Sequence, residues 1–138
     1  MDQIEQLTRL LVEFHERFAS WENAVIQDSG LTLPRMHTLE MIGSLGEPRM
    51  KELAVKMGVT TGALTVLVDR LVQAGLVERR PDAQDRRSIR VVLTEAGKSH
   101  FEAHHRLHRR LTEEIICALS DEEAAQFMTM LGKLIEHF

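Results

Sequence analysis

Residues 49–93 read RMKELAVKMGVTTGALTVLVDRLVQAGLVERRPDAQDRRSIRVVL, and this stretch decides the fold. Within it, residues 60–74 carry apolar side chains at spacings of three and four, which predicts a helix with one apolar face. Thr60 is a natural N-cap for that helix, and Gly58 lies in the short turn that follows a first helix over residues 50–57. Two helices joined so tightly predict a helix-turn-helix.

The periodicity changes after this pair of helices. Residues 76–80 and 89–93 are short runs rich in β-branched side chains, and residues 81–88 between them are turn formers and charges. This pattern predicts a β-hairpin with a long polar tip. A helix-turn-helix followed by a basic hairpin, the wing, is the arrangement of a winged helix. In such a fold the second helix of the pair enters the major groove of DNA and the wing lies next to it.

The flanking segments read as further helices. Residues 4–25 place apolar side chains on one helical face, and residues 32–45 and 94–119 are also helical in pattern. Ser120 followed three residues later by Glu123 has the spacing of a capping box and opens a last helix. The sequence therefore predicts a mainly α protein with a small β-hairpin, in the order α-α-α-α-β-β-α-α.

The net charge of −4 over 138 residues conceals an uneven distribution. Residues 49–98 hold ten basic and six acidic side chains, whereas residues 1–48 hold three and eight and residues 99–138 hold four and seven. The middle is thus positive and both flanks are negative. Charge separated in this way predicts a middle segment that faces a polyanion.

Composition excludes several classes of protein. A single cysteine excludes an intramolecular disulfide framework and a zinc ribbon, and no 18-residue apolar run or export leader is present. We therefore expect a cytoplasmic protein that does not enter the membrane. The rival from another class is a metal-binding enzyme, but the sequence lacks an HExxH motif and a phosphate-cradling loop. We expect no enzyme and no required cofactor.

Five arginines lie within twelve residues around the expected hairpin tip: Arg79, Arg80, Arg86, Arg87 and Arg90. Taken alone, such a cluster is equally compatible with DNA binding and with a solvated loop whose charge is partly neutralised by nearby aspartates. The adjacent helix-turn-helix favours DNA, because arginine binds phosphate and enters narrow minor grooves. The N-terminal part of the second helix is small and polar and can approach base edges closely.

Several motifs resemble the MarR family of bacterial transcription regulators. They are LTxxVDRL at residues 64–71, GLVER at 75–79, DRR at 85–87 and LTExG at 93–97. The resemblance implies an obligate homodimer on a palindromic operator, with Arg87 in the minor groove and Asp85 and Arg86 bracing the wing or contacting the backbone. It also implies repression that responds to an effector. We expect DNA contacts from Arg49, Lys51, Thr60, Thr61, Gly62, Thr65, Val66, Arg70, Arg79, Arg80, Asp85, Arg86 and Arg87.

The expected domains follow from this interpretation: residues 1–30 and 95–138 hold dimerisation helices, and residues 31–94 form the DNA-binding winged helix. Both ends carry broad apolar faces that a second copy would bury. The side chains expected in the dimer interface are Leu7, Leu11, Phe14, Phe127, Leu131, Leu134 and Phe138.

His104 and His108 lie four residues apart on one helical face, and two such histidines can chelate one divalent ion. These two and His37 match the zinc ligands of the zinc-uptake repressors within the same family. The carboxylate ligand of those repressors falls on Ala19, with His15, Glu16 and Glu22 within one turn. Three alternatives stay open: a zinc effector, an organic effector or none, and a redox signal. We expect Cys117, late in the fifth helix, to be a buried apolar filler and not a redox sensor.

Overall fold

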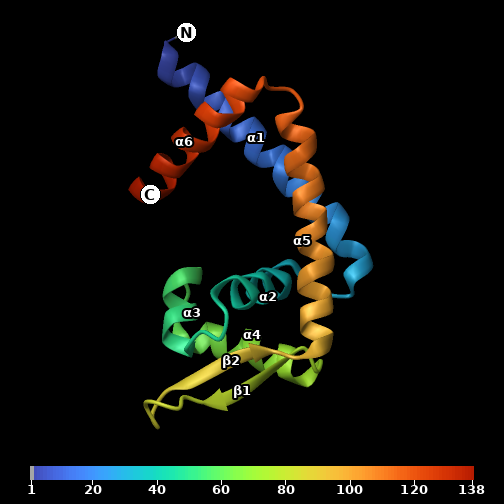
Figure 1. Ribbon diagram of the computed structural model, residues 1–138, viewed down its shortest axis with the longest axis vertical. Coiled ribbons are helices and arrows are strands. Elements are labelled where there is room, and N and C mark those ends of the chain that lie inside the picture. The colour runs from blue at the N-terminus through green and yellow to red at the C-terminus, as the bar shows by residue number, and fades with distance from the viewer. Residues whose placement is uncertain (1) are drawn as a thin grey trace. The chain divides into compact units, whose positions relative to one another are not determined.

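The computed structural model describes residues 2–138 (Figure 1). In chain order its elements are α1 (Gln3–Ile26), the 3₁₀ helix η1 (Gln27–Ser29), α2 (Leu33–Leu45), α3 (Met50–Met57), α4 (Thr61–Gln73), β1 (Val77–Pro81), β2 (Ile89–Leu93), α5 (Glu95–Ile116) and α6 (Asp121–His137). This order confirms the predicted helical chain with one hairpin. Over residues 2–138 no helix combines the length and the apolar character that crossing a membrane requires.

The chain divides into two compact units, Met1–Glu102 and Ala103–Phe138. Helix α5 begins in the first unit and ends in the second. The first unit contains the helix-turn-helix and the hairpin. Its hydrophobic core takes buried side chains from Ile26 at the end of α1 and from every element between α2 and β2. The core residues of these elements are Met36, Leu39, Ile42, Leu53, Ala54, Leu64, Val68, Leu71, Leu76, Val77 and Val91.

Thr60 and Ser120, which the sequence predicts at helix starts, are N-cap residues in the structure. Thr60 Oγ1 accepts a hydrogen bond from Ala63 N at 3.1 Å and caps α4. At the start of α6, Glu123 N donates to Ser120 Oγ at 3.2 Å and Ser120 N donates to Glu123 Oε2 at 2.8 Å, which completes the capping box. These bonds satisfy backbone N–H groups that have no partner within the helix.

Three boundaries differ from the sequence-based expectation. The 3₁₀ turn η1 follows α1 directly, and Pro81 belongs to β1 rather than to the loop. Helix α5 ends at Ile116, three residues early, because Ala118 N and Leu119 N donate to carbonyl groups three residues back instead of four. Such tightening of the last turn is common where a helix meets a short connection.

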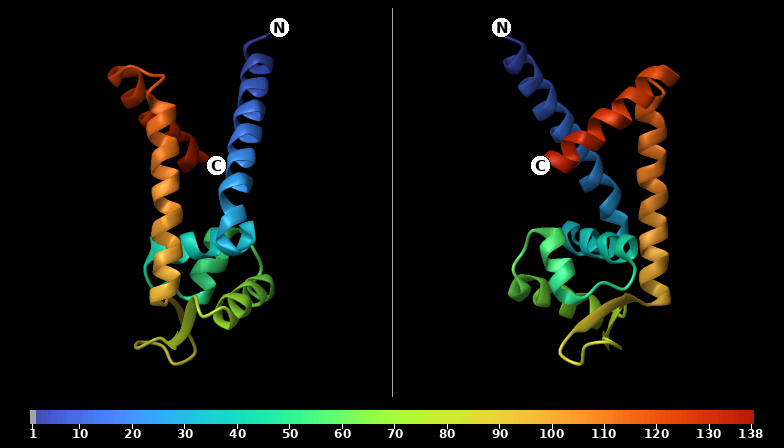
Figure 2. Two further views of the ribbon diagram at one scale, coloured as in Figure 1. Left: turned by 90° about the vertical axis from the view of Figure 1, so that its right-hand side faces the viewer. Right: turned by 60° about the vertical axis from the view of Figure 1, so that its left-hand side comes forward.

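The hairpin pairs β1 with β2 in antiparallel register, from Val77 opposite Leu93 to Pro81 opposite Ile89. On the other edge of β2, Val91 N donates to Pro48 O at 2.9 Å, so the connection between α2 and α3 lies beside the hairpin like a short third strand. Within the first unit the hairpin projects at the end opposite the N-terminus of α1 (Figure 2).

Candidate nucleic-acid interface

Helix α4 buries one face and exposes the other. Leu64, Val68 and Leu71 are completely buried, and they hold α4 against the core of the first unit. The opposite face is open to solvent over residues predicted to contact DNA: Thr61, Gly62, Thr65, Val66 and Arg70. The apolar stripe therefore sets which side of α4 a ligand can reach.

The turn before α4 depends on Gly58, which adopts a left-handed conformation at φ 65°. Its N–H group donates to Val55 O at 3.1 Å and thereby ends α3. A side chain at this φ is disfavoured, so glycine is what allows α4 to follow α3 within three residues.

The tip of the hairpin is shaped by Asp85. Its carboxylate accepts hydrogen bonds from Arg87 N at 3.0 Å and from Ser88 Oγ at 3.3 Å. The Arg87 side chain itself is 96% exposed, and Arg86 beside it is also exposed. Asp85 thus orders the backbone of the tip while the two guanidinium groups extend into solvent.

The two arginines on strand β1 form ion pairs within the protein. Arg79 Nη2 lies 2.5 Å from Asp69 Oδ1, which joins β1 to α4, and Arg80 Nη2 lies 3.2 Å from Glu78 Oε2. Both pairs are partly or largely exposed, so each contributes little to stability. The Asp69–Arg79 pair links the orientation of the hairpin to that of α4.

A groove of about 660 Å³ lies between the start of α3, the exposed face of α4 and the hairpin. Residues predicted to contact DNA line much of it: Arg49, Lys51, Thr61, Thr65, Arg79, Asp85 and Arg87. The structure therefore brings these seven predicted residues together on one side of the first unit. The other predicted residues are exposed but do not line this groove: Thr60, Gly62, Val66, Arg70, Arg80 and Arg86.

Asp82 is the residue of this region that sequence reasoning missed. It follows β1 directly and its side chain is 2% exposed, between the guanidinium groups of Arg49 and Arg90. From the sequence alone, Asp82 is indistinguishable from Asp85 as a loop aspartate that partly neutralises the charge of the arginine cluster. Only the long-range pairing with Arg49, 33 positions earlier, distinguishes it.

The histidines predicted as metal ligands lie in different units. In the first unit, His37 Nε2 is 2.6 Å from Glu22 Oε2, so Glu22 is the carboxylate of α1 that reaches this histidine. Burial raises the pKa of Glu40, one turn further along α2, while the charge of His37 acts to lower it and that of Glu22 to raise it.

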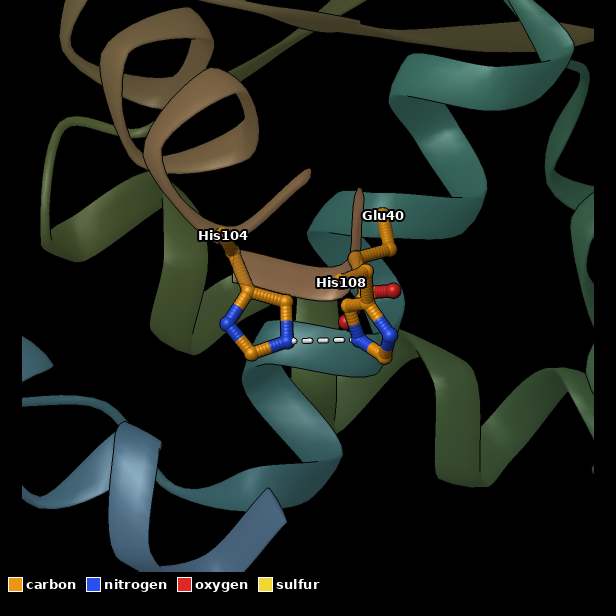
Figure 3. Close-up of side chains that lie close together, drawn as sticks. All are labelled: Glu40, His104 and His108. Atoms are coloured by element: carbon orange, nitrogen blue, oxygen red, sulfur yellow. Dashed lines mark hydrogen bonds between the residues drawn. The ribbon is translucent and has the colours of Figure 1, made fainter. Parts of the chain in front are cut away.

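In the second unit, His104 Nε2 and His108 Nε2 lie 3.1 Å apart on α5 (Figure 3). His104 is buried and His108 is half-buried. Cys117, expected as a buried apolar filler, is exposed in the single chain.

Known proteins resemble this chain both in the winged helix and over most of its length. The model of the MarR family matches residues 31–89, which span the helix-turn-helix and most of the hairpin. The HTH-type transcriptional regulator BilQ from Clostridium symbiosum is 30% identical over 121 residues, which cover 88% of this chain and 84% of BilQ. The chain belongs to the MarR family. It is a transcription regulator of this family and not an enzyme.

Solved structures of MarR-family proteins share the fold. FabT from Streptococcus pneumoniae, solved in complex with DNA, superposes with a TM-score of 0.88 at 25% identity, covering 98% of this chain and 96% of FabT. A mutant MarR from E. coli complexed with operator DNA gives a TM-score of 0.75 at 29% identity, covering 97% and 99% of the two chains. The similarity therefore includes the terminal helices as well as the winged helix.

Proposed function

We propose that this MarR-family regulator is a repressor that binds a palindromic DNA operator as a homodimer. The observation that carries the proposal is the groove between α4 and the hairpin, where the exposed face of α4 lies beside the hairpin tip with its exposed Arg86 and Arg87. Helix α4 would enter the major groove, and Arg86 and Arg87 would reach the adjacent minor groove or its phosphates. The two DNA-complex structures with a similar fold support this mode of docking.

The side chains of α4 indicate what it would read. Residues 61–68 contain no charged or amide side chain, so this half of the helix offers hydroxyl groups and methyl groups only. Thr65 Oγ1 donates its proton to Thr61 O at 2.8 Å, which leaves it able to accept a hydrogen bond or to present its methyl group. Val66 is 59% exposed and suits contact with a thymine methyl.

Gly62 offers a test of close approach by DNA. A Cβ added there would meet nothing nearer than Thr60 Oγ1 at 4.0 Å, so the protein itself has room for alanine. Gly62→Ala should stabilise the chain by a few tenths to about 1 kcal/mol, since alanine favours the helix. The same methyl group should weaken DNA binding by about fivefold or more, through overpacking against the duplex.

The two effects of Gly62→Ala are measured by thermal unfolding and by fluorescence anisotropy on a fixed duplex. Gln73→Ala, exposed at the other end of α4, is the matched control and should leave DNA affinity unchanged. Wild-type affinity in Gly62→Ala would show that α4 does not approach the duplex closely.

Apolar faces at both ends of the chain support the homodimer. In the first unit α1 exposes Leu7, Leu11 and Phe14. In the second unit α6 exposes Phe127, Leu131 and Leu134, and Phe138, which directly follows α6, is exposed too. A monomer that left both faces in water would carry apolar patches of the kind that mark protein interfaces.

Replacing Leu134, which is 61% exposed in the single chain, tests the dimer. Leu134→Asp should raise the dimer dissociation constant at least tenfold, because burying one leucine side chain contributes roughly 1.5–3 kcal/mol. Sedimentation equilibrium measures the constant. Thr129→Asp, on the other side of α6, is the control. It should leave the dimer dissociation constant within about twofold of the wild-type value, as is usual for a surface substitution. Equal constants for wild type and Leu134→Asp would place the interface elsewhere.

The repressor role itself is tested with the DNA that flanks the chain's own gene. The full chain should bind that duplex with two protomers per site and reduce transcription from its promoter in a purified system. Binding without any reduction in transcript would contradict repression, and one protomer per site would contradict the dimeric operator complex.

A zinc effector is the second candidate, and His104 and His108 favour it. Two nitrogen ligands of a tetrahedral zinc ion lie about 3.3 Å apart, given bonds of about 2.0–2.1 Å, and the two Nε2 atoms here are 3.1 Å apart. His37, the third histidine that the sequence predicts as a ligand, belongs to the first unit, where it lies beside Glu22. Zinc titrated into chelator-treated protein should bind with a dissociation constant below about 1 μM. Equal affinity in the His104→Ala/His108→Ala variant would exclude this pair and leave an organic effector.

A further inference from the structure

The carboxylate of Asp82 joins both sides of the hairpin to the start of α3, which lies 33 positions earlier in the sequence. Arg90 Nε on β2 donates to Asp82 Oδ1 at 3.0 Å, and Arg49 Nε at the start of α3 lies 2.8 Å from Asp82 Oδ2. Arg90 also donates from Nη1 to Glu47 O at 2.6 Å. We call Arg49, Asp82 and Arg90 the wing clamp, because it ties the hairpin to the connection between α2 and α3.

The wing clamp lies where the hairpin tip departs from its strands. Asp82 N donates to Ser88 O at 3.1 Å, and this bond closes the loop that carries Arg86 and Arg87. The direction of that loop relative to α3 is therefore fixed at Asp82. The hydrogen bond from Arg90 is the largest influence on the pKa of Asp82, and it lowers that pKa despite the opposing effect of burial.

The charge of Asp82 is unfavourable for binding a polyanion. It neutralises two arginines, each about one-third exposed, that border the proposed DNA-binding face. Electrostatics alone predicts that removing this negative charge tightens binding to any DNA. A buried carboxylate at this place is useful to a DNA-binding protein only if the geometry that it imposes matters more than the charge it cancels.

We infer that Asp82 is a positioning residue that holds the wing, through Arg49 and Arg90, at the angle required for specific DNA recognition. The inference rests on the proposed function and adds a specificity determinant to it. Asp82 need not touch DNA: it sets where Arg86 and Arg87 meet the duplex once α4 is in the major groove.

The test compares two duplexes, one selected from a random pool by the wild-type chain and one of unrelated sequence and equal length. Asp82→Asn should weaken binding to the selected duplex by about tenfold or more, since it breaks a buried charge pair. Its binding to the unrelated duplex should stay equal or become tighter. Specific affinity therefore falls while non-specific affinity does not, whereas simple loss of folded protein would lower both.

Glu78→Gln is the matched control, because it removes the same unit charge from β1 at an exposed position outside the wing clamp. It should change the affinity for both duplexes by the same factor and therefore leave the ratio of the two affinities unchanged. If Asp82→Asn behaved in the same way, Asp82 would act through charge alone and the inference would be overturned.

Arg90→Lys provides a second test that does not change net charge. One ammonium group cannot reproduce the two contacts of Arg90, to Asp82 and to Glu47 O, so the affinity ratio of the two duplexes should fall several-fold. An unchanged ratio in a folded Arg90→Lys variant would also overturn the inference. A wild-type chain that did not distinguish the duplexes would instead refute the proposed function.

Discussion

The Arg86→Ala/Arg87→Ala variant is expected to bind its selected DNA duplex about 100-fold more weakly than the wild-type chain, with about tenfold for each arginine. Both side chains are exposed at the hairpin tip, and Asp85 orders the backbone beneath them. Within residues 2–138, the only ion pair of either side chain is the exposed one between Arg87 Nε and Asp85 Oδ1 at 3.9 Å, so the free energy of unfolding should change by less than about 0.5 kcal/mol. The loss would therefore report DNA contacts directly.

The salt dependence of binding separates the two kinds of contact that these arginines can make. If both bind phosphates, the slope of log K against log salt should decrease by up to about 1.8, because each contact contributes about 0.9. If Arg87 reads a narrow minor groove, the loss should be larger on A·T-rich flanks than on G·C-rich flanks. Fluorescence anisotropy at several salt concentrations measures both.

The Arg109→Ala/Arg110→Ala variant is the matched control. These two adjacent arginines are exposed on α5 in the second unit and carry the same charge as the wing pair. Neither is among the residues predicted to contact DNA, so their loss should change DNA affinity by less than about threefold, or under about 0.7 kcal/mol. Equal losses in the two double variants would show that net charge, and not the wing, determines affinity.

Gly97→Ala is expected to destabilise the fold by about 3 kcal/mol or more, at the upper end of overpacking costs. A Cβ at Gly97 would lie 1.9 Å from Leu76 O and 3.0 Å from Leu76 C, and both are backbone atoms. The start of α5 is fixed at this point, because Thr94 N donates to Leu76 O at 3.0 Å and Thr94 Oγ1 donates to Gly75 O at 2.6 Å. The helix cannot move away without breaking these bonds.

Thermal or denaturant unfolding measures the effect, and about 3 kcal/mol corresponds to a decrease of roughly 10 °C in Tm for a chain of this size. Gly132→Ala in α6 is the control, since a Cβ there meets nothing within 4 Å and should be neutral or stabilising. A Tm for Gly97→Ala within a few degrees of wild type would contradict the close packing of α5 on Leu76.

Local patterns in the sequence were sufficient for most of the fold. Thr60 and Ser120 cap helices as predicted, and the change from helical to strand periodicity locates the hairpin. These features depend on residues three or four positions apart, so one sequence contains the information. The same holds for the exposed face of α4, which follows from the buried stripe at Leu64, Val68 and Leu71.

The wing clamp could not be predicted in this way. Asp82 and Arg90 flank the hairpin tip, but Arg49 joins them only because residues 47–49 pair with β2. The sequence also offered Glu16, Glu22 and His15 equally as neighbours of His37, and the packing of α1 on α2 selected Glu22. Both cases require tertiary distances, which periodicity and capping do not contain.

The most direct test of the account is equilibrium binding of the full chain to the selected duplex and to a scrambled duplex of the same length, at physiological salt. Sequence-specific regulation predicts two protomers per selected duplex and an affinity at least about 1,000-fold higher than for the scrambled duplex. Equal affinity for the two duplexes would contradict the central claim that α4 and the wing together read a DNA sequence.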